Sequence, residues 1–223
     1  ANTDHESQAP ERVRTARRAG PARVFPWAVG FHAEQQEVVA EVLTKIKWAI
    51  DSEAIVAGGA PRNWHLGELA NDIDLYMRSY CINTIGRTKH QIEKMIGEKL
   101  EWTQGTEVNN YKFGMDIEIV SIVSFMYKGV LFQLIICNPN YAYSDFKMQI
   151  VKHMDIGINR VWCDWYSLQD SGRIYYTEEA DNDFNNKTLT LFQDCMTDTQ
   201  LVHCMKTHLP KMVKYFPDYK IVM

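Results

Sequence analysis

The chain has 223 residues, of which 46% are hydrophobic, and its formal net charge is -4. This length suits one domain, or one domain with a small appendage, and the apolar content is sufficient for a sizeable core. The charge excludes a globally basic nucleic-acid-binding protein, although it is compatible with a local basic patch.

Residues 1–26 differ in composition from the rest of the chain. They are rich in Ala, Arg and Pro and poor in large apolar residues, and no lysine appears before Lys45. We predict a poorly ordered basic arm or a non-native extension. The arginine cluster leaves open the alternative that this arm contacts RNA or DNA.

Apolar periodicity and glycine positions predict the elements of the next part. Val39, Val42, Ile46 and Ile50 recur at helical steps and predict a helix over 34–51. The expected elements that follow are a buried strand at 54–59, a short helix from Pro61 through Trp64, a strand at 72–77 and a helix at 87–102.

The second half of the chain predicts a hairpin followed by mixed elements. Residues 115–138 alternate as two strands with a tight turn at Lys128-Gly129. Ser144 is the expected N-cap of a helix at 144–154. The remaining expected elements are a strand at 157–167, a strand at 172–178 that could pair with it, and a mostly helical end at 197–216, kinked near Pro210. This order predicts an α+β domain with a mixed or antiparallel central sheet flanked by helices.

The cysteines and the hydropathy pattern predict a cytoplasmic protein. Five scattered cysteines without a C-x-x-C pair are typical of reduced thiols. No apolar run reaches transmembrane length and no signal peptide is evident, so no membrane partner is expected. His203, Cys204 and His208 lie close enough in sequence for a zinc site, but packing and surface positions are the preferred interpretation.

The stretch GGAPRNWHLGELANDIDLYM, residues 58–77, contains the strongest functional pattern. Asp72 and Asp74 lie two apart on an expected strand, so both carboxylates face one side, roughly 7 Å apart. Such a pair is unfavourable unless a cation compensates it, and Mg2+ is the ion that prefers carboxylates together with water and phosphate oxygens. Gly58 and Gly59 would let backbone N–H groups approach a phosphate at a helix start, and Arg62 would pair with phosphate oxygens.

This pattern resembles the head-domain signature G-G-x-V-R-D-x-L-L-G-x-x-x-x-D-x-D of tRNA nucleotidyltransferases. That group comprises the CCA-adding enzymes and bacterial poly(A) polymerases of the polymerase β-like nucleotidyltransferase superfamily. The matching residues, in step without a gap, are Gly58, Gly59, Arg62, Leu66, Gly67, Asp72 and Asp74. The later segment HMDIGINRV is similar to the R-R-D-F-T-I-N-A-M segment of the family at Asp155, Ile158 and Asn159. The resemblance covers roughly residues 34–165 and implies the polymerase β-like nucleotidyltransferase fold.

The resemblance also implies roles for individual residues. Asp72 and Asp74 would be catalytic and hold Mg2+ or Mn2+, with Asp155 as the preferred third carboxylate and Asp116 or Glu118 ranked second. The residues expected to bind the nucleoside triphosphate (NTP) are Gly58, Gly59, Arg62, Asn63 and Asn159.

Several departures from the family pattern bear on substrate. Asn63 stands where the family usually has Asp, and His153 and Met154 replace an arginine pair. The base-selecting motif E-D-x-x-R has no counterpart in step, since TEEADNDF at 177–184 lacks the arginine. The helical body that grips tRNA in those enzymes is also not expected here. The chain therefore looks more like the compact members of phages and toxin systems, acting in a bacterial or phage-infected host cytoplasm.

The expected reaction is transfer of a nucleoside monophosphate from an NTP to a hydroxyl, with release of pyrophosphate. The preferred acceptor is an RNA 3′ end, above all that of tRNA. Nucleotidylation of a protein or a small molecule, and a non-catalytic nucleotide- or RNA-binding module, are the alternatives. Residues 27–168 would form the nucleotidyltransferase domain, and 169–223 a C-terminal strand and helical extension packed on it. The nucleotide base and the oligomeric state are not predicted.

Two further groups of residues have a functional and an ordinary interpretation. Five aromatic residues could stack on bases, although core and sheet packing is the preferred interpretation: Tyr141, Tyr143, Trp162, Trp165 and Tyr166. Four lysines near the C-terminus could follow a phosphate backbone, although a solvated helix face is the simpler and preferred explanation: Lys206, Lys211, Lys214 and Lys220.

Overall fold

The computed structural model describes six ranges of the chain: 29–79, 85–103, 112–113, 117–138, 145–170 and 174–223. The predicted arm at 1–26 and the side chains of Asp116, Tyr141, Tyr143 and Ser144 lie outside the described residues. No helix in these ranges is long and apolar enough to cross a membrane.

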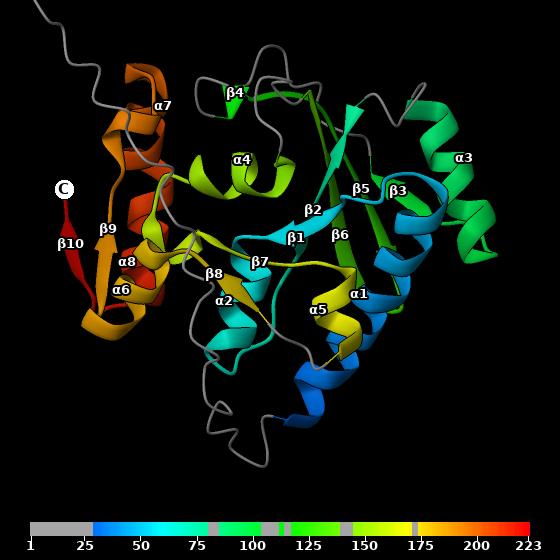
Figure 1. The fold of residues 1–223 in the computed structure, drawn as a ribbon, viewed down its shortest axis with the longest axis horizontal. Helices are drawn as coiled ribbons and strands as arrows, with labels where there is room; N and C mark the ends of the chain where they lie inside the picture. Colours follow the sequence, from blue (N-terminus) through cyan, green and yellow to red (C-terminus); the bar gives the residue numbers. More distant parts are fainter. Residues whose placement is uncertain (1–28, 80–84, 104–111, 114–116, 139–144, 171–173) are drawn as a thin grey trace, which may run out of the picture.

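The centre of the molecule is an eight-stranded mixed sheet (Figure 1). Its strands are β1 (Ile55–Ala57), β2 (Ile73–Arg78), β3 (Glu101–Thr103), β4 (Lys112–Phe113), β5 (Ile117–Tyr127), β6 (Val130–Asn138), β7 (Val161–Cys163) and β8 (Tyr175–Tyr176). Their order is β3-β5-β6-β2-β1-β7-β8, and β4 pairs with β5. The β2–β6 pair is parallel, whereas the other strand pairs of this sheet are antiparallel. The predicted α+β class with a mixed sheet is confirmed.

The predicted hairpin is also confirmed, and its turn residues explain it. Lys128 and Gly129 both have positive φ, 47° and 76°. A two-residue turn with positive φ at both positions matches the right-handed twist of the strands that it joins. The turn therefore sets the β5–β6 register, in which Tyr127 pairs with Val130.

Helices cover both faces of the sheet. On one face, Leu43 and Ile46 of α1 (Val29–Ala49) are buried in one cluster with Leu75 and Phe132. Part of α3 (Ile85–Ile96) belongs to the same cluster, and α3 packs beside α1 in Figure 1. On the opposite face, α4 (Phe146–Lys152) packs its apolar side on β1, β2, β5 and β6. Alternate residues of β2 therefore belong to different layers, which decides where its acidic side chains lie.

Three predicted boundaries are wrong, each for a local reason. The helix expected at 87–102 ends at Ile96, because Gly97 adopts φ +85° and the chain then forms β3. The N-cap of α4 is Asp145, whose side chain accepts from two backbone N–H groups, and not Ser144. The strand expected at 157–167 is instead the 3-10 turn η2 (Gly157–Asn159), β7 and helix α5 (Trp165–Asp170), whose start is closed by reciprocal bonds between Asp164 and Ser167.

The last part of the chain gathers beside the sheet, at the left of Figure 1. It contains α6 (Glu178–Asn186), η3 (Gln193–Cys195), α7 (Asp198–His203), a π-helical turn η4 (Cys204–His208) and α8 (Leu209–Tyr215). The short strands β9 (Thr188–Thr190) and β10 (Lys220–Val222) pair in parallel as a second sheet, and with α6 they were not predicted. The expected kink near Pro210 corresponds to the π-helical turn just before it. Pro210 itself lies in the first turn of α8, where a missing N–H is tolerated.

A third apolar cluster joins this part to η2. Ile156 and Ile158 are fully buried together with Leu189, Leu209 and Met212. The helix α8 is thereby held next to the loop that follows α4, within reach of the acidic face of β2.

Candidate functional site

The two aspartates singled out in the sequence lie on the same face of β2. Asp72 directly precedes the strand, and Asp74 is its second residue. Both are half-buried, while Ile73 and Leu75 between and after them are fully buried in the opposite layer. The predicted arrangement of the two carboxylates is therefore present.

The electrostatics of this pair are unfavourable in the protein alone. Burial, followed by the charge of Asp72, raises the pKa of Asp74 to about 7, although Lys211 and Arg62 act in the opposite direction. A carboxyl group with this pKa is partly protonated at neutral pH because two nearby negative charges share a poorly hydrated site. A bound cation would remove that cost.

A residue not predicted to lie at the site contacts the pair from β6. Gln133 pairs with Asp74 in the parallel β2–β6 register, and its Nε2 donates to Asp72 Oδ2 at 3.3 Å. Gln133 is the polar residue within the apolar run LFQLII, so a polar side chain inside a buried strand was the available sequence indication.

The glycine pair lies at the start of α2 (Gly59–His65), as predicted. Gly58 has φ 81° and ψ -121°, a conformation that residues with a side chain rarely adopt. A Cβ at Gly58 would also meet the Met154 Cε at 3.4 Å. The backbone N–H of Gly58 donates to Val161 O at 3.0 Å, so this group ties α2 to β7.

Arg62 is a buried cation held by neutral partners. Arg62 is 8% exposed, and burial lowers the pKa of its guanidinium. Nη1 donates to Asn159 Oδ1 at 2.6 Å, and Nε and Nη2 both donate to Asn63 Oδ1 at 3.1 and 2.8 Å. Within the described ranges no carboxylate forms an ion pair with Arg62. A buried positive charge that is oriented but not neutralised favours an anionic ligand.

These groups line one pocket of about 260 Å³. Its wall includes the residues that the sequence predicted for metal and nucleotide binding: Gly58, Gly59, Arg62, Asn63, Asp72, Asp74, Asp155 and Asn159. Residues of η4 and α8 also line the pocket. The structure thus brings the two sequence motifs together, although they are about 80 positions apart.

The residues from the C-terminal part were missed as site residues. Lys211, Met212 and Tyr215 line the pocket from α8, and His208 lines it from η4. Lys211 was considered for a phosphate-binding patch, and its charge reaches Asp74. The spacing of 208, 211, 212 and 215 places them on one helical face, which is the periodicity that could have indicated a shared wall.

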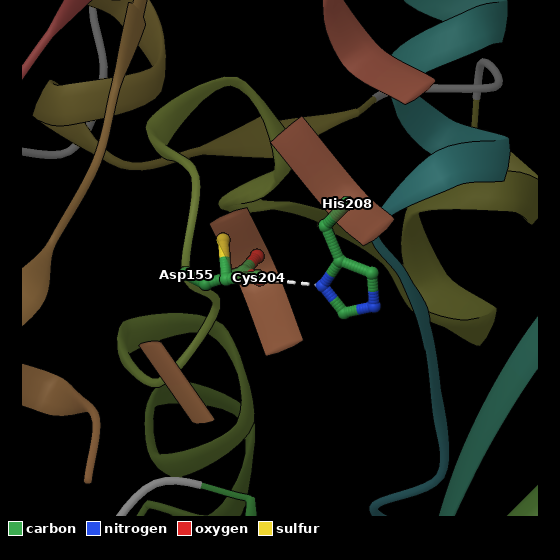
Figure 2. A group of neighbouring side chains, drawn as sticks. All are labelled: Asp155, Cys204 and His208. Carbon is green, nitrogen blue, oxygen red and sulfur yellow. Dashed lines mark hydrogen bonds and ion pairs between the residues drawn. The ribbon is translucent and has the colours of Figure 1, made fainter. Parts of the chain in front are cut away.

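Asp155 lines the pocket, but its carboxylate contacts His208 and not Asp72 or Asp74. Its Oδ2 lies 2.6 Å from His208 Nδ1, and Figure 2 shows the Cys204 thiol beside it. Burial opposes ionisation of Asp155, yet the hydrogen bond from His208 holds the pKa of this carboxyl below its usual range. The same hydrogen bond raises the pKa of His208, and burial together with Asp155 raises the pKa of the Cys204 thiol.

The remaining candidates lie away from the pocket. Glu118 is exposed on β5, between the buried Ile117 and Ile119, as expected for a solvated strand face. Trp165 donates from Nε1 to Thr44 Oγ1 at 2.8 Å and packs edge-on against Trp48, so its contacts are with α1. The acidic stretch 177–184, compared above with a base-selecting motif, forms most of α6, where Asp183 is fully buried.

Comparison with known proteins gives a fold but no close relative. No protein-family model and no curated protein sequence matches the chain. Thirty chains of solved structures do match. A CCA-adding enzyme in complex with ATP has a TM-score of 0.51 at 14% identity, with 87% of this chain and 42% of that chain covered.

Two further structures agree with this result. A tRNA-processing enzyme in an apo form has a TM-score of 0.51 at 13% identity, covering 81% of this chain and 44% of that one. The Thermotoga maritima CCA-adding enzyme complexed with tRNA has a TM-score of 0.50 at 12% identity, covering 90% and 40%. This chain spans about two fifths of the length of these enzymes. The predicted nucleotidyltransferase fold is thus confirmed: the chain shares the fold of the CCA-adding enzymes.

Proposed function

We propose that the protein is a metal-dependent nucleotidyltransferase that transfers a nucleoside monophosphate from an NTP to a hydroxyl group. One observation carries this proposal: a half-buried aspartate pair lines the same pocket as a buried arginine that has no carboxylate ion-pair partner among the described residues. The first group requires a cation and the second favours an anion, so the pocket suits a metal–triphosphate complex.

The residues present fit a divalent metal ion. Asp72 and Asp74 offer hard oxygen ligands on one face of β2, and their unfavourable proximity is what a cation would relieve. Mg2+ or Mn2+ held there would lower the pKa of the attacking hydroxyl and offset charge on the leaving pyrophosphate. Arg62, fixed by Asn63 and Asn159, would contact the β- and γ-phosphates.

The reaction balances without a further reactant. The acceptor oxygen forms a bond to the α-phosphorus, and the bond from that phosphorus to the pyrophosphate oxygen breaks. The hydroxyl proton passes to solvent or a nearby base, and pyrophosphate leaves with its electron pair. Lys211, which approaches Asp74 from α8, adds a second positive charge for the leaving group.

An RNA 3′ end is the acceptor that we prefer. The fold is shared with enzymes whose structures were determined with ATP and with tRNA. The short C-terminal part, with its exposed lysines Lys206 and Lys214, would then contact the RNA backbone. Asp155 as the third carboxylate stays a prediction.

A transfer assay tests the proposal. The protein is incubated with each α-labelled NTP, Mg2+ or Mn2+, and total cellular RNA and protein, and the products are separated. We expect label in the tRNA band, with loss of transfer in Asp72→Asn and Asp74→Asn and retention in Asp218→Asn, an exposed aspartate outside the pocket.

Other outcomes discriminate between the alternatives. Label in protein or in a small molecule would keep the chemistry and change the acceptor. Unchanged transfer in both aspartate variants would refute the mechanism. Absence of label with every nucleotide and metal, alongside measurable NTP binding, would identify a non-catalytic binding module.

A further inference from the structure

A second group of potential metal ligands lies at the edge of the pocket. The ligand atoms of Asp155, Cys204 and His208 all lie within 4.8 Å of one another. Figure 2 shows the carboxylate and the thiol side by side, with the His208 Nδ1 directed at the carboxylate and its other ring nitrogen directed away. Cys204 and His208 come from η4, whereas Asp155 comes from the loop after α4, about 50 residues earlier.

The backbone that carries two of these groups is itself unusual. Cys204 and His208 are the first and last residues of the π-helical turn. Such turns interrupt α-helices at a cost in regular hydrogen bonding, and they occur frequently at functional sites. Here the wider turn presents a thiol and an imidazole four residues apart toward the same carboxylate.

We propose that Asp155, Cys204 and His208 bind a Zn2+ ion. A thiolate and an imidazole are the donors that select zinc, whereas the oxygen-only pair at Asp72 and Asp74 suits magnesium. The thiolate and the carboxylate together carry two negative charges and compensate the ion, while the imidazole binds as a neutral ligand. The site therefore differs in chemistry from the Asp72–Asp74 pair and uses neither of these residues. Asp155 would then hold Zn2+ in place of the role of third catalytic carboxylate that the sequence predicted.

The geometry requires only side-chain adjustment. In a tetrahedral site with bonds of about 2.0–2.3 Å, neighbouring ligand atoms lie roughly 3.3–3.8 Å apart. The Asp155–His208 contact of 2.6 Å would open by somewhat less than 1 Å, and the thiol would move inward. Binding releases the thiol proton and any proton on His208 Nδ1 to solvent, so zinc affinity falls at low pH.

The three ligands leave a fourth position, and the surroundings suggest its direction. Asp155 and His208 both line the pocket, whereas Cys204 is 1% exposed and lies in the apolar cluster behind them. The fourth position therefore opens toward the pocket, where water or a ligand group would occupy it. Zinc would tie η4 and α8 to the loop before η2 and so hold Lys211 in position opposite Asp74.

The test uses the full chain, freed of metal with a chelator and titrated with Zn2+ and with Co2+ in the absence of nucleotide. We expect one tightly bound Zn2+, a rise in melting temperature on its addition, and a thiolate-to-cobalt charge-transfer band with Co2+. Cys204→Ala and His208→Gln should each weaken zinc binding more than about 100-fold. Mutating a residue that only hydrogen-bonds to a metal ligand already lowers metal affinity by about 10–100-fold.

Two control variants make the result specific. Cys163→Ala removes a buried cysteine from a different cluster. The double variant Asp72→Asn/Asp74→Asn removes the two carboxylates of the proposed catalytic site. Both should retain the zinc and the cobalt band. His208 has a side chain that is 41% exposed, so His208→Gln provides the test if Cys204→Ala fails to fold.

Wild-type protein without the thiolate–cobalt band, or zinc affinity unchanged in His208→Gln, would show that the three residues form a hydrogen-bonded network only. Zinc binding is measured without nucleotide. A negative result in this test would therefore not bear on the proposed transfer reaction, and a negative transfer assay would not bear on the zinc site.

Discussion

Replacing Asp74 with asparagine should stabilise the metal-free protein at neutral and alkaline pH. The substitution keeps the size of the side chain and removes the charge that Asp72 and burial oppose. Raising the pKa of Asp74 from 3.8 to about 7 corresponds to roughly 4 kcal/mol, at 1.36 kcal/mol for each pKa unit. Because Asp74 is only half-buried, part of this is screened, and we expect about 2–4 kcal/mol.

The sign of the pH dependence follows from proton binding. Between pH 3.8 and 7 the folded state keeps the proton on Asp74, while the unfolded state loses it. The wild type therefore loses stability as pH rises through this window and has lost the whole contribution above pH 7. The advantage of Asp74→Asn should be near zero at pH 4, grow up to pH 7 and stay constant above it.

Thermal unfolding with chelator present, from pH 4 to 9, measures this effect. For a chain of this size, about 2–4 kcal/mol corresponds to a melting temperature raised by roughly 5–10 °C at pH 8. Addition of Mg2+ at pH 8 should raise the melting temperature of the wild type and leave Asp74→Asn nearly unchanged. Asp218→Asn is the matched control. An advantage of the same size at pH 5 and pH 8, or a variant less stable at every pH, would refute the assignment of strain to this pair.

Two further predictions concern the other walls of the pocket. Asn159→Ala leaves the Arg62 Nη1 without its acceptor, so it should cost about 1–3 kcal/mol of unfolding free energy and weaken NTP binding, measured by calorimetry against the exposed-site control Asn182→Ala. His208→Gln, with chelator present, removes the ion pair between His208 and Asp155. Both groups are charged in the pH range that runs from the lowered pKa of Asp155 to the raised pKa of His208. The cost of this substitution in denaturant unfolding should therefore be largest in that window and decrease as pH rises through the pKa of His208; a cost that does not vary with pH would contradict the ion pair.

The functional pattern of residues 58–77 could be recognised from sequence because it is local. Strand alternation places Asp72 and Asp74 on one face without reference to any partner, and Gly58 supplies a conformation that few other residues adopt. The hairpin was predictable for the same reason, since the turn at Lys128-Gly129 determines the register of the strands beside it.

Errors in element boundaries arose where short-range bonds compete with periodicity. The run 157–167 alternates like a strand, yet the paired hydrogen bonds of Asp164 and Ser167 turn the chain into α5. The strands β9 and β10 are each three residues long and lie 30 positions apart, so neither carries enough periodicity to be recognised.

The amino-acid sequence by itself determined the acidic pair, the glycine turn and the fold class, because each depends on backbone conformation over a few residues. Only the tertiary structure decided that Gln133 contacts Asp72, that Arg62 meets Met212 across 150 positions, and that Asp155 lies against η4. The first contact comes from the pairing of β2 with β6, and the other two are created when the third apolar cluster packs η4 and α8 beside the sheet. Burial of apolar surface is non-directional and leaves no local pattern that names the partner, so such contacts become visible only once the chain is folded.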